Sequence, residues 1–587
     1  VTVTGMDKPS AGADPDTDVT LVTVPADKAT IDKVQWYNGS TPLESGSKFE
    51  AGKEYYAYIN VAPSAGYCFN SDGLNFNYAG TVTVNGDTIL GSKTKVSNGK
   101  LIIETASTVV TSETPSSGIN NAAVLQEAIG NAVPGSTIKL DGNIVLDNDT
   151  PLIIEGKGSV ENPITLDLNG YTITGSNGQT GTPATSAEGK KAGILWISQS
   201  TVVLTDLSSN AVKGGIINDA DKNSICGILL TSPSTGDPAS LTIKNGVRVE
   251  IENGQTGVRP LCIYEPSTSA PEISLIIDDV AVKTSGSLLN PTNKANTNVV
   301  VNGGTFETTA GKPFTSDSAF AYTTINGGTF SGAFSYTVLK SSIGSDKVAV
   351  YDRNGDGKII TTVQSLPASY AAHISAKGTD TVYTKVYLAS GNELSVLAEA
   401  GMLVADATIE IKETISCTYP DGKAFGSATG SVSKLTFDIK DEVVLSGSMP
   451  LNLAEVTVTG GGQVADNFFT ASDSENFELK NSGNVYSCSL KSDKVAAKLT
   501  TASGKVSVYT SVAAAVNSAK GADGTFDIFT DYITGAYFAS TGNLTLNLNG
   551  NEWTYTGNDY AFRPYSSSKT LTIKNGTVVA NANATAA

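Results

Sequence analysis

The sequence is poor in the residue types on which most catalytic and nucleic-acid-binding sites depend. Its 587 residues include one histidine and four arginines, and charged residues make up only 16% of the chain, below the usual ~25%. Acidic residues outnumber basic ones, 57 to 39, which gives a net charge of −18. Because nucleic-acid binding needs a basic surface, we predict no nucleic-acid partner.

Cysteine and long apolar runs are also scarce. The five cysteines are widely spread without a C-x-x-C pair, which argues against a zinc site or a dense disulfide framework. A bridge between Cys226 and Cys262 in neighbouring repeats is one reading, and plain buried thiols are the reading that we favour. No run of ~18 apolar residues occurs, so we predict no membrane span.

Residues 1–111 contain short runs in which apolar and polar residues alternate. The runs at 33–37 and 55–61 are followed or preceded by Gly-containing turns such as Asn38-Gly39. Regular short strands over ~100 residues predict a β-sandwich. Residues 34–69 resemble the Ig-like modules common in surface proteins of Firmicutes. In such a sandwich Trp36 and Tyr58 would be core anchors, and a sugar-stacking role is the alternative for Trp36.

From about residue 112 internal repeats dominate the sequence. LTIKNG occurs identically at 241–246 and 571–576, and VNGGTF at 301–306 recurs as INGGTF at 325–330. The Asn-Gly steps recur after 24 residues from Asn302 to Asn326 and after 26 residues from Asn549 to Asn575. A period in the middle twenties with Asn-Gly corners predicts a parallel β-helix, in which each coil adds strands to the coil below.

A longer repeat is superposed on the coils. Segments 120–146 and 509–534 each contain apolar residues at helical spacing, followed by the alternating pattern of a strand. Segment 391–415 is a looser third copy. A helix at these positions would cap the open end of a solenoid. Segments 348–363 and 476–490 each predict a closing hairpin. We therefore predict four parts: a sandwich at 1–111, β-helix modules at 112–365 and 366–493, and a third module at 494–587 that is cut off at Ala587.

The helix-then-strand units, the NGGTF and LTIKNG coils and the hairpins together resemble the adhesin-like surface proteins of Firmicutes, which carry tandem right-handed parallel β-helix (pectate-lyase-like) modules. The resemblance extends over nearly the whole chain. It implies an extracellular protein at the cell surface or cell wall. Its implied partners are glycans or proteins of host or microbial surfaces, and self-association is a further expectation.

The sharpest metal candidate is the segment DRNGDGKI at 352–359. Asp352, Asn354 and Asp356 place oxygens at positions 1, 3 and 5, with glycine at position 6, as in the first half of a calcium loop. Val363 occupies position 12, where such a loop needs a bidentate carboxylate. We favour a plain hairpin turn and keep a weak calcium site as the alternative. No other cofactor is predicted.

Aromatic residues are dense between 552 and 565. The segment contains Trp553, Tyr555, Tyr560, Phe562 and Tyr565. Because aromatic rings stack on sugars and anchor protein interfaces, Trp553, Tyr555, Tyr560 and Tyr565 form our candidate contact surface. Stacking of these rings in the core is the reading that we favour.

β-Helices also house polysaccharide-degrading enzymes, so a catalytic set is a further possibility for this sequence. The acidic pair Asp278 and Asp279 on a predicted strand would point to opposite faces. The Arg-Pro step at Arg259 recurs at Arg563, which indicates a structural corner. His373 lies in an Ala-rich segment and is expected on a helix surface. Adhesin-type binding is the leading prediction, and a polysaccharide lyase or glycoside hydrolase and a structural surface-layer or filament component are the alternatives.

Overall fold

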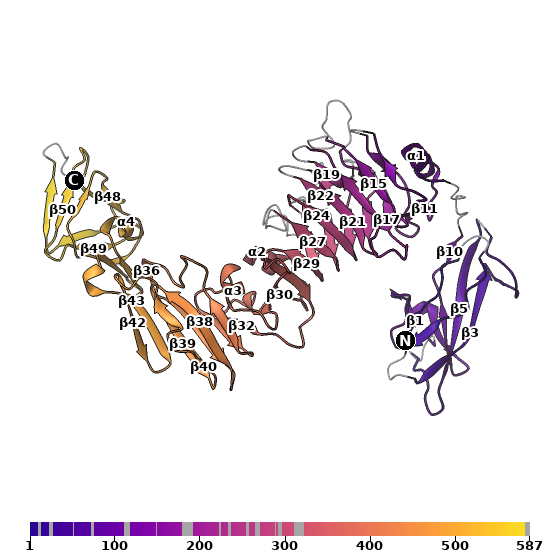
Figure 1. Cartoon of the computed structure of the whole chain (residues 1–587), viewed down its shortest axis with the longest axis horizontal. Coiled ribbons are helices and arrows are strands. Elements are labelled where there is room, and N and C mark those ends of the chain that lie inside the picture. Colours follow the sequence, from indigo (N-terminus) through magenta and orange to yellow (C-terminus); the bar gives the residue numbers. More distant parts are fainter. Residues whose placement is uncertain are drawn as a thin grey trace. The chain divides into compact units, whose positions relative to one another are not determined.

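The computed structural model describes most of the chain and shows a β protein. It covers residues 1–9, 13–22, 27–50, 52–71, 76–110, 118–147, 150–178, 192–221, 225–232, 236–253, 258–264, 271–287, 289–290, 296–309 and 322–581. Strands make up 46% and helices 8% of the chain, and long parallel sheets are present, which confirms the all-β prediction (Figure 1). Two compact units are found, Val1–Ala310 with Phe314–Thr323, and Gly311–Pro313 with Thr324–Ala587. The predicted boundaries at 111, 365 and 493 stay predictions.

The N-terminal part contains two sheets. The smaller has the order β2-β1-β6-β7 and the larger the order β4-β3-β5-β9-β8, with β10 also paired to β5. The elements are β1 (Thr2–Thr4), β2 (Thr20–Val22), β3 (Ala29–Asn38), β4 (Thr41–Pro42), β5 (Glu54–Pro63), β6 (Thr83–Val84), β7 (Asp87–Thr88), a 3₁₀ helix (Gly91–Lys93), β8 (Thr94–Ser97), β9 (Lys100–Glu104) and β10 (Thr108–Val109). Side chains from both sheets share one apolar core. This arrangement is consistent with a β-sandwich.

Alternation along the strands decides which N-terminal aromatic rings enter that core. Trp36 is 4% exposed, and its ring meets Phe49 edge-on at 5.0 Å, so it is a core residue as predicted. On β5, Tyr55 and Ile59 are also buried. Tyr58 lies on the opposite, outer face because successive side chains of a strand point to opposite sides. The prediction that Tyr58 is a core anchor is therefore wrong.

In the rest of the first unit the strands recur in threes. They form three parallel runs, which are β11-β14-β17-β20-β23-β26, β12-β15-β18-β21-β24-β27 and β13-β16-β19-β22-β25. Their bounds are β11 (Thr137–Lys139), β12 (Ile144–Val145), β13 (Leu152–Glu155), β14 (Ile164–Asp167), β15 (Thr172–Gly175), β16 (Leu195–Ser198), β17 (Thr201–Thr205), β18 (Gly215–Asn218), β19 (Cys226–Thr231), β20 (Ala239–Ile243), β21 (Val247–Ile251), β22 (Arg259–Tyr264), β23 (Ile273–Ile277), β24 (Val280–Thr284), β25 (Leu289–Asn290), β26 (Thr297–Val301) and β27 (Thr305–Thr308). Pairing of every third strand is consistent with the predicted parallel β-helix.

Aliphatic side chains are stacked inside these coils. The parallel register aligns one buried residue from each of five successive strands of the first run. This ladder consists of Ile164, Val202, Leu241, Leu275 and Val299. The sequence repeats therefore place equivalent apolar residues above one another, as a solenoid core requires.

Helix α1 (Ala122–Asn131) precedes the first coil, as the helix-then-strand repeat predicts. The Asn121 side chain caps it by accepting the amide of Val124 at 3.0 Å. Gln126 donates to the carbonyl of Ile153 and accepts its amide, both at 2.9 Å. Because Ile153 belongs to β13, the helix satisfies backbone groups of the first strand in its run.

The second unit repeats these parts. Its helices are α2 (Tyr336–Ser341), α3 (Ser395–Glu399) and α4 (Val512–Lys520), with 3₁₀ helices at Tyr383–Lys385 and Ser492–Lys494. α4 begins with a Ser511 cap, and α3 has only five residues, in keeping with the looser third copy. The hairpins β30–β31 (Val348–Arg353, Ile359–Gln364) and β42–β43 (Phe477–Ser482, Val485–Leu490) are both antiparallel, which confirms the two predicted hairpins. Their role in closing a module stays a prediction.

Parallel strands again recur in threes near the end of the described chain, in the runs β46-β49-β52, β47-β50-β53 and β48-β51. The strands from residue 323 onward are β28 (Thr323–Ile325), β29 (Gly328–Ser331), β30 (Val348–Arg353), β31 (Ile359–Gln364), β32 (Ala372–Lys377), β33 (Val386–Leu388), β34 (Ala407–Ile411), β35 (Ile415–Thr418), β36 (Gly430–Ser431), β37 (Ser433–Ile439), β38 (Val444–Leu451), β39 (Ala454–Gly460), β40 (Gln463–Val464), β41 (Phe469–Ala471), β42 (Phe477–Ser482), β43 (Val485–Leu490), β44 (Ala497–Thr501), β45 (Val506–Tyr509), β46 (Gly524–Ile528), β47 (Tyr532–Thr534), β48 (Phe538–Ser540), β49 (Leu544–Asn547), β50 (Glu552–Tyr555), β51 (Phe562–Pro564), β52 (Leu571–Lys574) and β53 (Thr577–Ala580). Among the helices that the structure describes, none is long and apolar enough to cross a membrane. None of the five cysteines forms a disulfide bond in the described structure, so Cys226 and Cys262 are not bridged.

Candidate functional site

A groove of about 430 Å³ lies on the outer face of the larger N-terminal sheet. Its volume falls within the range of about 300–1,000 Å³ that is common for small-molecule sites. The sheet register sets its lining side chains in rows. One row crosses from Gln35 on β3 to Tyr58 on β5 and Glu104 on β9. The chain therefore assembles the groove from strands that are distant in sequence.

Tyrosine rings form one side of this groove. Tyr37 meets the ring of Tyr58 edge-on at 5.2 Å and stacks on Tyr56 at 5.6 Å. The Tyr58 hydroxyl donates to a Glu104 carboxylate oxygen at 3.0 Å. Burial, together with this hydrogen bond, raises the pKa of Tyr58 to about 12. The phenol therefore stays protonated at neutral pH and holds Glu104 in place.

Lysines supply most of the charge in the groove. The lining contains three lysines, Lys33, Lys93 and Lys95, against one acidic residue, Glu104. Lys93 Nζ lies 3.4 Å from a Glu104 oxygen. Lys33 and Lys95 form no ion pair with any residue in the described part of the chain. The groove is thus locally positive on a chain whose net charge is −18.

The sequence did not identify this groove, although one local signal was present. In the run YYAYIN at 55–60, alternation requires that Tyr56 and Tyr58 face away from the side that buries Tyr55. The lysines gave no such signal, since only the register of β3, β5, β9 and β8 brings them together.

The candidate contact surface at 552–565 is divided between core and solvent. Trp553 and Tyr555 are 1% and 2% exposed. The Trp553 ring lies 4.7 Å from Tyr532 and 5.2 Å from Phe562 between ring centroids. Tyr560 is half-buried and Tyr565 is 68% exposed. For Trp553 and Tyr555 the favoured core reading holds, and neither belongs to an exposed contact surface.

The segment 352–359 forms the hairpin turn between β30 and β31. The Asn354 side-chain oxygen accepts the amides of Asp356 and Lys358, at 3.1 and 2.9 Å. An Asp352 oxygen accepts the side-chain amide of Asn392 at 2.6 Å. Asn354 therefore stabilises the turn, and Asp352 joins the hairpin to a segment that follows it in the chain. Within the described ranges no group of three or more His, Cys, Asp or Glu side chains could hold a metal ion.

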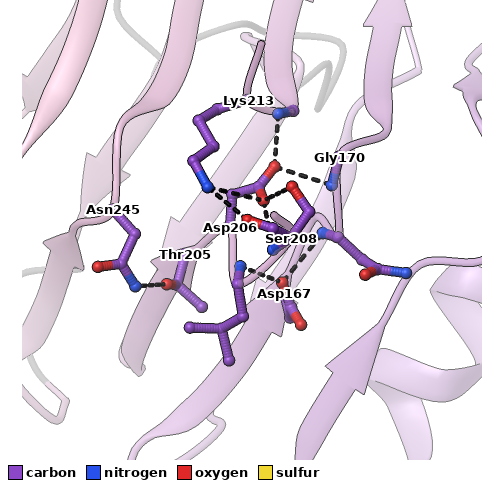
Figure 2. A network of polar contacts seen from close by, with 10 residues as sticks. Asp167, Gly170, Thr205, Asp206, Ser208, Lys213 and Asn245 are labelled. Atoms are coloured by element: carbon purple, nitrogen blue, oxygen red, sulfur yellow. Dashed lines mark hydrogen bonds and ion pairs between the residues drawn. The ribbon is translucent and has the colours of Figure 1, made fainter. Parts of the chain in front are cut away.

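A buried carboxylate forms a further polar network (Figure 2). The side chain of Asp206 is 0% exposed. It accepts the amides of Gly170 and Ser208 at 2.8 Å each, the Ser208 hydroxyl and the amide of Gly214. Burial raises the pKa of Asp206, but the bonds from Ser208, Gly214 and Gly170 outweigh burial and hold it below its usual value. Lys213 Nζ lies 4.0 Å from the same carboxylate.

Asn-Gly steps form left-handed turns in both units, and those at Asn169 and Asn245 lie next to the Asp206 network (Figure 2). Asn169 and Asn245 have φ angles of 49° and 60°, and Asn549 and Asn575 have 47° and 57°. This left-handed region is one that asparagine tolerates better than most residues. Asn245 donates to the Thr205 hydroxyl at 2.7 Å, as Figure 2 shows. The polar groups join the turns of successive coils, so we assign the network to fold stability.

The groups considered for catalysis lie in a turn and on strands of the coils. Asp278 and Asp279 lie in the turn between β23 and β24, so their placement on a strand was wrong. Asp278 accepts the side-chain amide of Asn302 at 2.8 Å. Arg259 lies on β22 and Arg563 on β51, each on the third strand of a coil. Both therefore lie on strands and not at corners, so the expectation of a corner is wrong, although the two positions are equivalent in their coils.

His373 lies on strand β32, not on a helix as predicted. The antiparallel pairing of β32 with β34 places Glu410 opposite, with Nδ1 at 3.2 Å from a carboxylate oxygen. The imidazole stacks on Tyr387 at 4.5 Å between centroids. The other Glu410 oxygen is 2.9 Å from Lys440 Nζ, and the Tyr370 hydroxyl donates to Glu410 at 3.2 Å. This cluster joins neighbouring strands on one face of the sheet.

Burial lowers the pKa of His373 below its ordinary value of 6.5, and this effect exceeds the opposing effect of Glu410. At pH values between the lowered pKa of the folded chain and the ordinary value of 6.5, the unfolded chain binds more protons at His373 than the folded chain does. We expect the stability of the second unit to fall as the pH drops from about 6.5 through the folded pKa. His373 is the sole histidine. The urea concentration at the midpoint of unfolding should therefore depend less on pH, between pH 7 and pH 5, in His373→Gln than in the unaltered chain. An unchanged pH profile in the variant would contradict this assignment.

The groove differs from the other places described above. It combines aromatic rings, amide side chains and lysines around an open volume, and two of these lysines have no ion pair with a described residue. The Asp206 and Glu410 groups, in contrast, are used within the fold. Comparison of the chain with protein-family models, curated proteins and solved structures finds no match.

Proposed function

We propose that this chain is an extracellular surface protein of adhesin type that binds a glycan through the groove on its N-terminal sheet. The observation that carries the proposal is the meeting of Tyr37, Tyr58 and several polar side chains in one groove of about 430 Å³. An apolar wall with a few placed polar groups is the usual composition of a ligand site.

A sugar fits this chemistry because it presents both apolar ring faces and hydroxyl groups. The tyrosine rings offer flat apolar surfaces with polar tips. The amides of Gln35 and Asn60 can each donate and accept hydrogen bonds, as sugar hydroxyls do. Ser92 and Ser97 add hydroxyls to the lining. The groove therefore offers partners for both kinds of sugar surface.

The architecture that we propose is an N-terminal Ig-like sandwich followed by right-handed parallel β-helix modules. Two sheets with a common core support the sandwich. Strands that pair with every third strand, capping helices and closing hairpins support the β-helix modules. Right-handed winding is supported by the general preference of parallel crossover connections, about 98% of which are right-handed.

A panel of neutral and acidic oligosaccharides, titrated into the whole chain by calorimetry, tests the proposal. At least one sugar should bind, and Tyr37→Ala should weaken that binding about fivefold or more, because truncating an aromatic anchor costs about 1 kcal/mol or more. Tyr565→Ala is the matched control, since Tyr565 is exposed outside the groove, and it should bind normally. Absence of binding across the panel, or loss in Tyr565→Ala instead, would refute the proposal.

A further inference from the structure

The positions of the groove lysines indicate which sugar would bind. Lys33 on β3 pairs across the sheet with Asn60, Asn60 with Ile102, and Ile102 with Lys95 on β8. The two lysines thus stand at the ends of one row that crosses four strands. Strands lie about 4.8 Å apart, so their backbones are separated by about 14 Å. Long lysine side chains from both ends can reach an anion above Asn60.

The neighbouring row carries the ring that a sugar would contact. Tyr58 is two residues before Asn60 on β5 and projects from the same face, so the rows are about 7 Å apart. Lys93 and Tyr58 both engage Glu104. The acidic residue of the groove is thereby already partnered, whereas Lys33 and Lys95 have no ion pair with a described residue.

We infer that the groove binds a carboxylated sugar, such as a uronic acid residue of an acidic polysaccharide, with the sugar ring against Tyr37 and Tyr58 and the carboxylate between Lys33 and Lys95. This inference rests on the proposed function and adds the substrate class to it. The match is one of charge: a local excess of lysine faces the ligand on a chain that is otherwise strongly acidic.

An acidic peptide fits the groove less well. Peptides that add to a sheet use a free edge strand, but the groove lies over β5, which is paired with β3 on one side and β9 on the other. The lining also offers a single aliphatic side chain, Ile102, so it lacks pockets for apolar peptide residues. Paired tyrosine rings with amide and hydroxyl groups match a sugar better.

The decisive experiment compares oligogalacturonate with its fully methyl-esterified form, which has the same rings without the charge. The whole chain should bind the acid at least about tenfold more tightly than the ester, and this preference should shrink as salt is raised. The double variant Lys33→Gln/Lys95→Gln should lose about tenfold in affinity for the acid and less than about twofold for the ester. Lys48→Gln, whose lysine pairs with Asp14 outside the groove lining, is the control and should bind as the unaltered chain does.

The outcomes separate this inference from the function on which it rests. Equal affinity for acid and ester, unaffected by the double variant, would overturn the carboxylate assignment and leave glycan binding in place. Failure to bind either form, together with every neutral sugar of the panel, would overturn the proposed function itself. Polyglutamate that binds as tightly as oligogalacturonate would show that the groove takes polyanions in general and would overturn the sugar assignment.

Discussion

Replacing Trp553 by alanine is expected to lower the free energy of unfolding of the C-terminal coils by about 3–5 kcal/mol. Trp553 is 1% exposed and is among the largest fully buried side chains. Its ring lies within 5.7 Å of the ring centroids of Tyr532, Phe538 and Phe562. Truncation would remove this contact area and leave a cavity that β47, β48 and β51 cannot fill without moving.

Hydrogen exchange measured on peptides from 524–581 would report this loss locally. Tyr565→Ala is the control, because its exposed side chain should change stability by no more than about 0.5 kcal/mol. If Trp553→Ala left exchange unchanged while Tyr565→Ala increased it, the assignment of Trp553 to the core would be wrong.

Asp206→Ala is expected to destabilise the stacked strands β14 to β21 by about 2–3 kcal/mol. The substitution would leave the amides of Gly170, Ser208 and Gly214 without their acceptor. The amide of Gly214 is buried and the other two are part-buried. A buried donor that loses its partner costs about 1–3 kcal/mol, and a part-buried donor costs less because water can reach it. Since the pKa of Asp206 is held below its usual value by these bonds, its contribution should be present at neutral pH and lost as the pH falls through the folded pKa.

The loss should appear as faster hydrogen exchange in peptides that cover β14 to β21. Glu161→Ala, which removes an exposed acidic side chain of the same unit, should leave exchange unchanged. Equal effects of Asp206→Ala and Glu161→Ala would contradict the role of the Asp206 network in joining the coils.

Much of the fold could be predicted from the sequence because its signals are local or repeated. The Asn-Gly steps at Asn169 and Asn549 mark corners, since both residues adopt a left-handed conformation. The hairpin at 348–363 follows from its turn residues, and helix α1 from its spacing and the Asn121 cap. Repeats add the stacking of coils, because equivalent residues must occupy equivalent places.

The groove and the histidine cluster could not be predicted in the same way. Tyrosines occur on both faces of β5, so composition alone did not separate buried Tyr55 from outward-facing Tyr58. Alanines around His373 suggested a helix, but pairing with β33 and β34 makes the segment a strand. Lys33 and Lys95 are brought into one row across the sheet only by the strand register, which no local sequence pattern specifies.

The most direct test of glycan binding by the groove is a crystal structure of the chain with bound oligogalacturonate. We predict difference density for a sugar ring against Tyr37 and Tyr58, with its carboxylate toward Lys33 or Lys95. Density for the sugar at Tyr560 and Tyr565, with the N-terminal groove empty, would contradict the account.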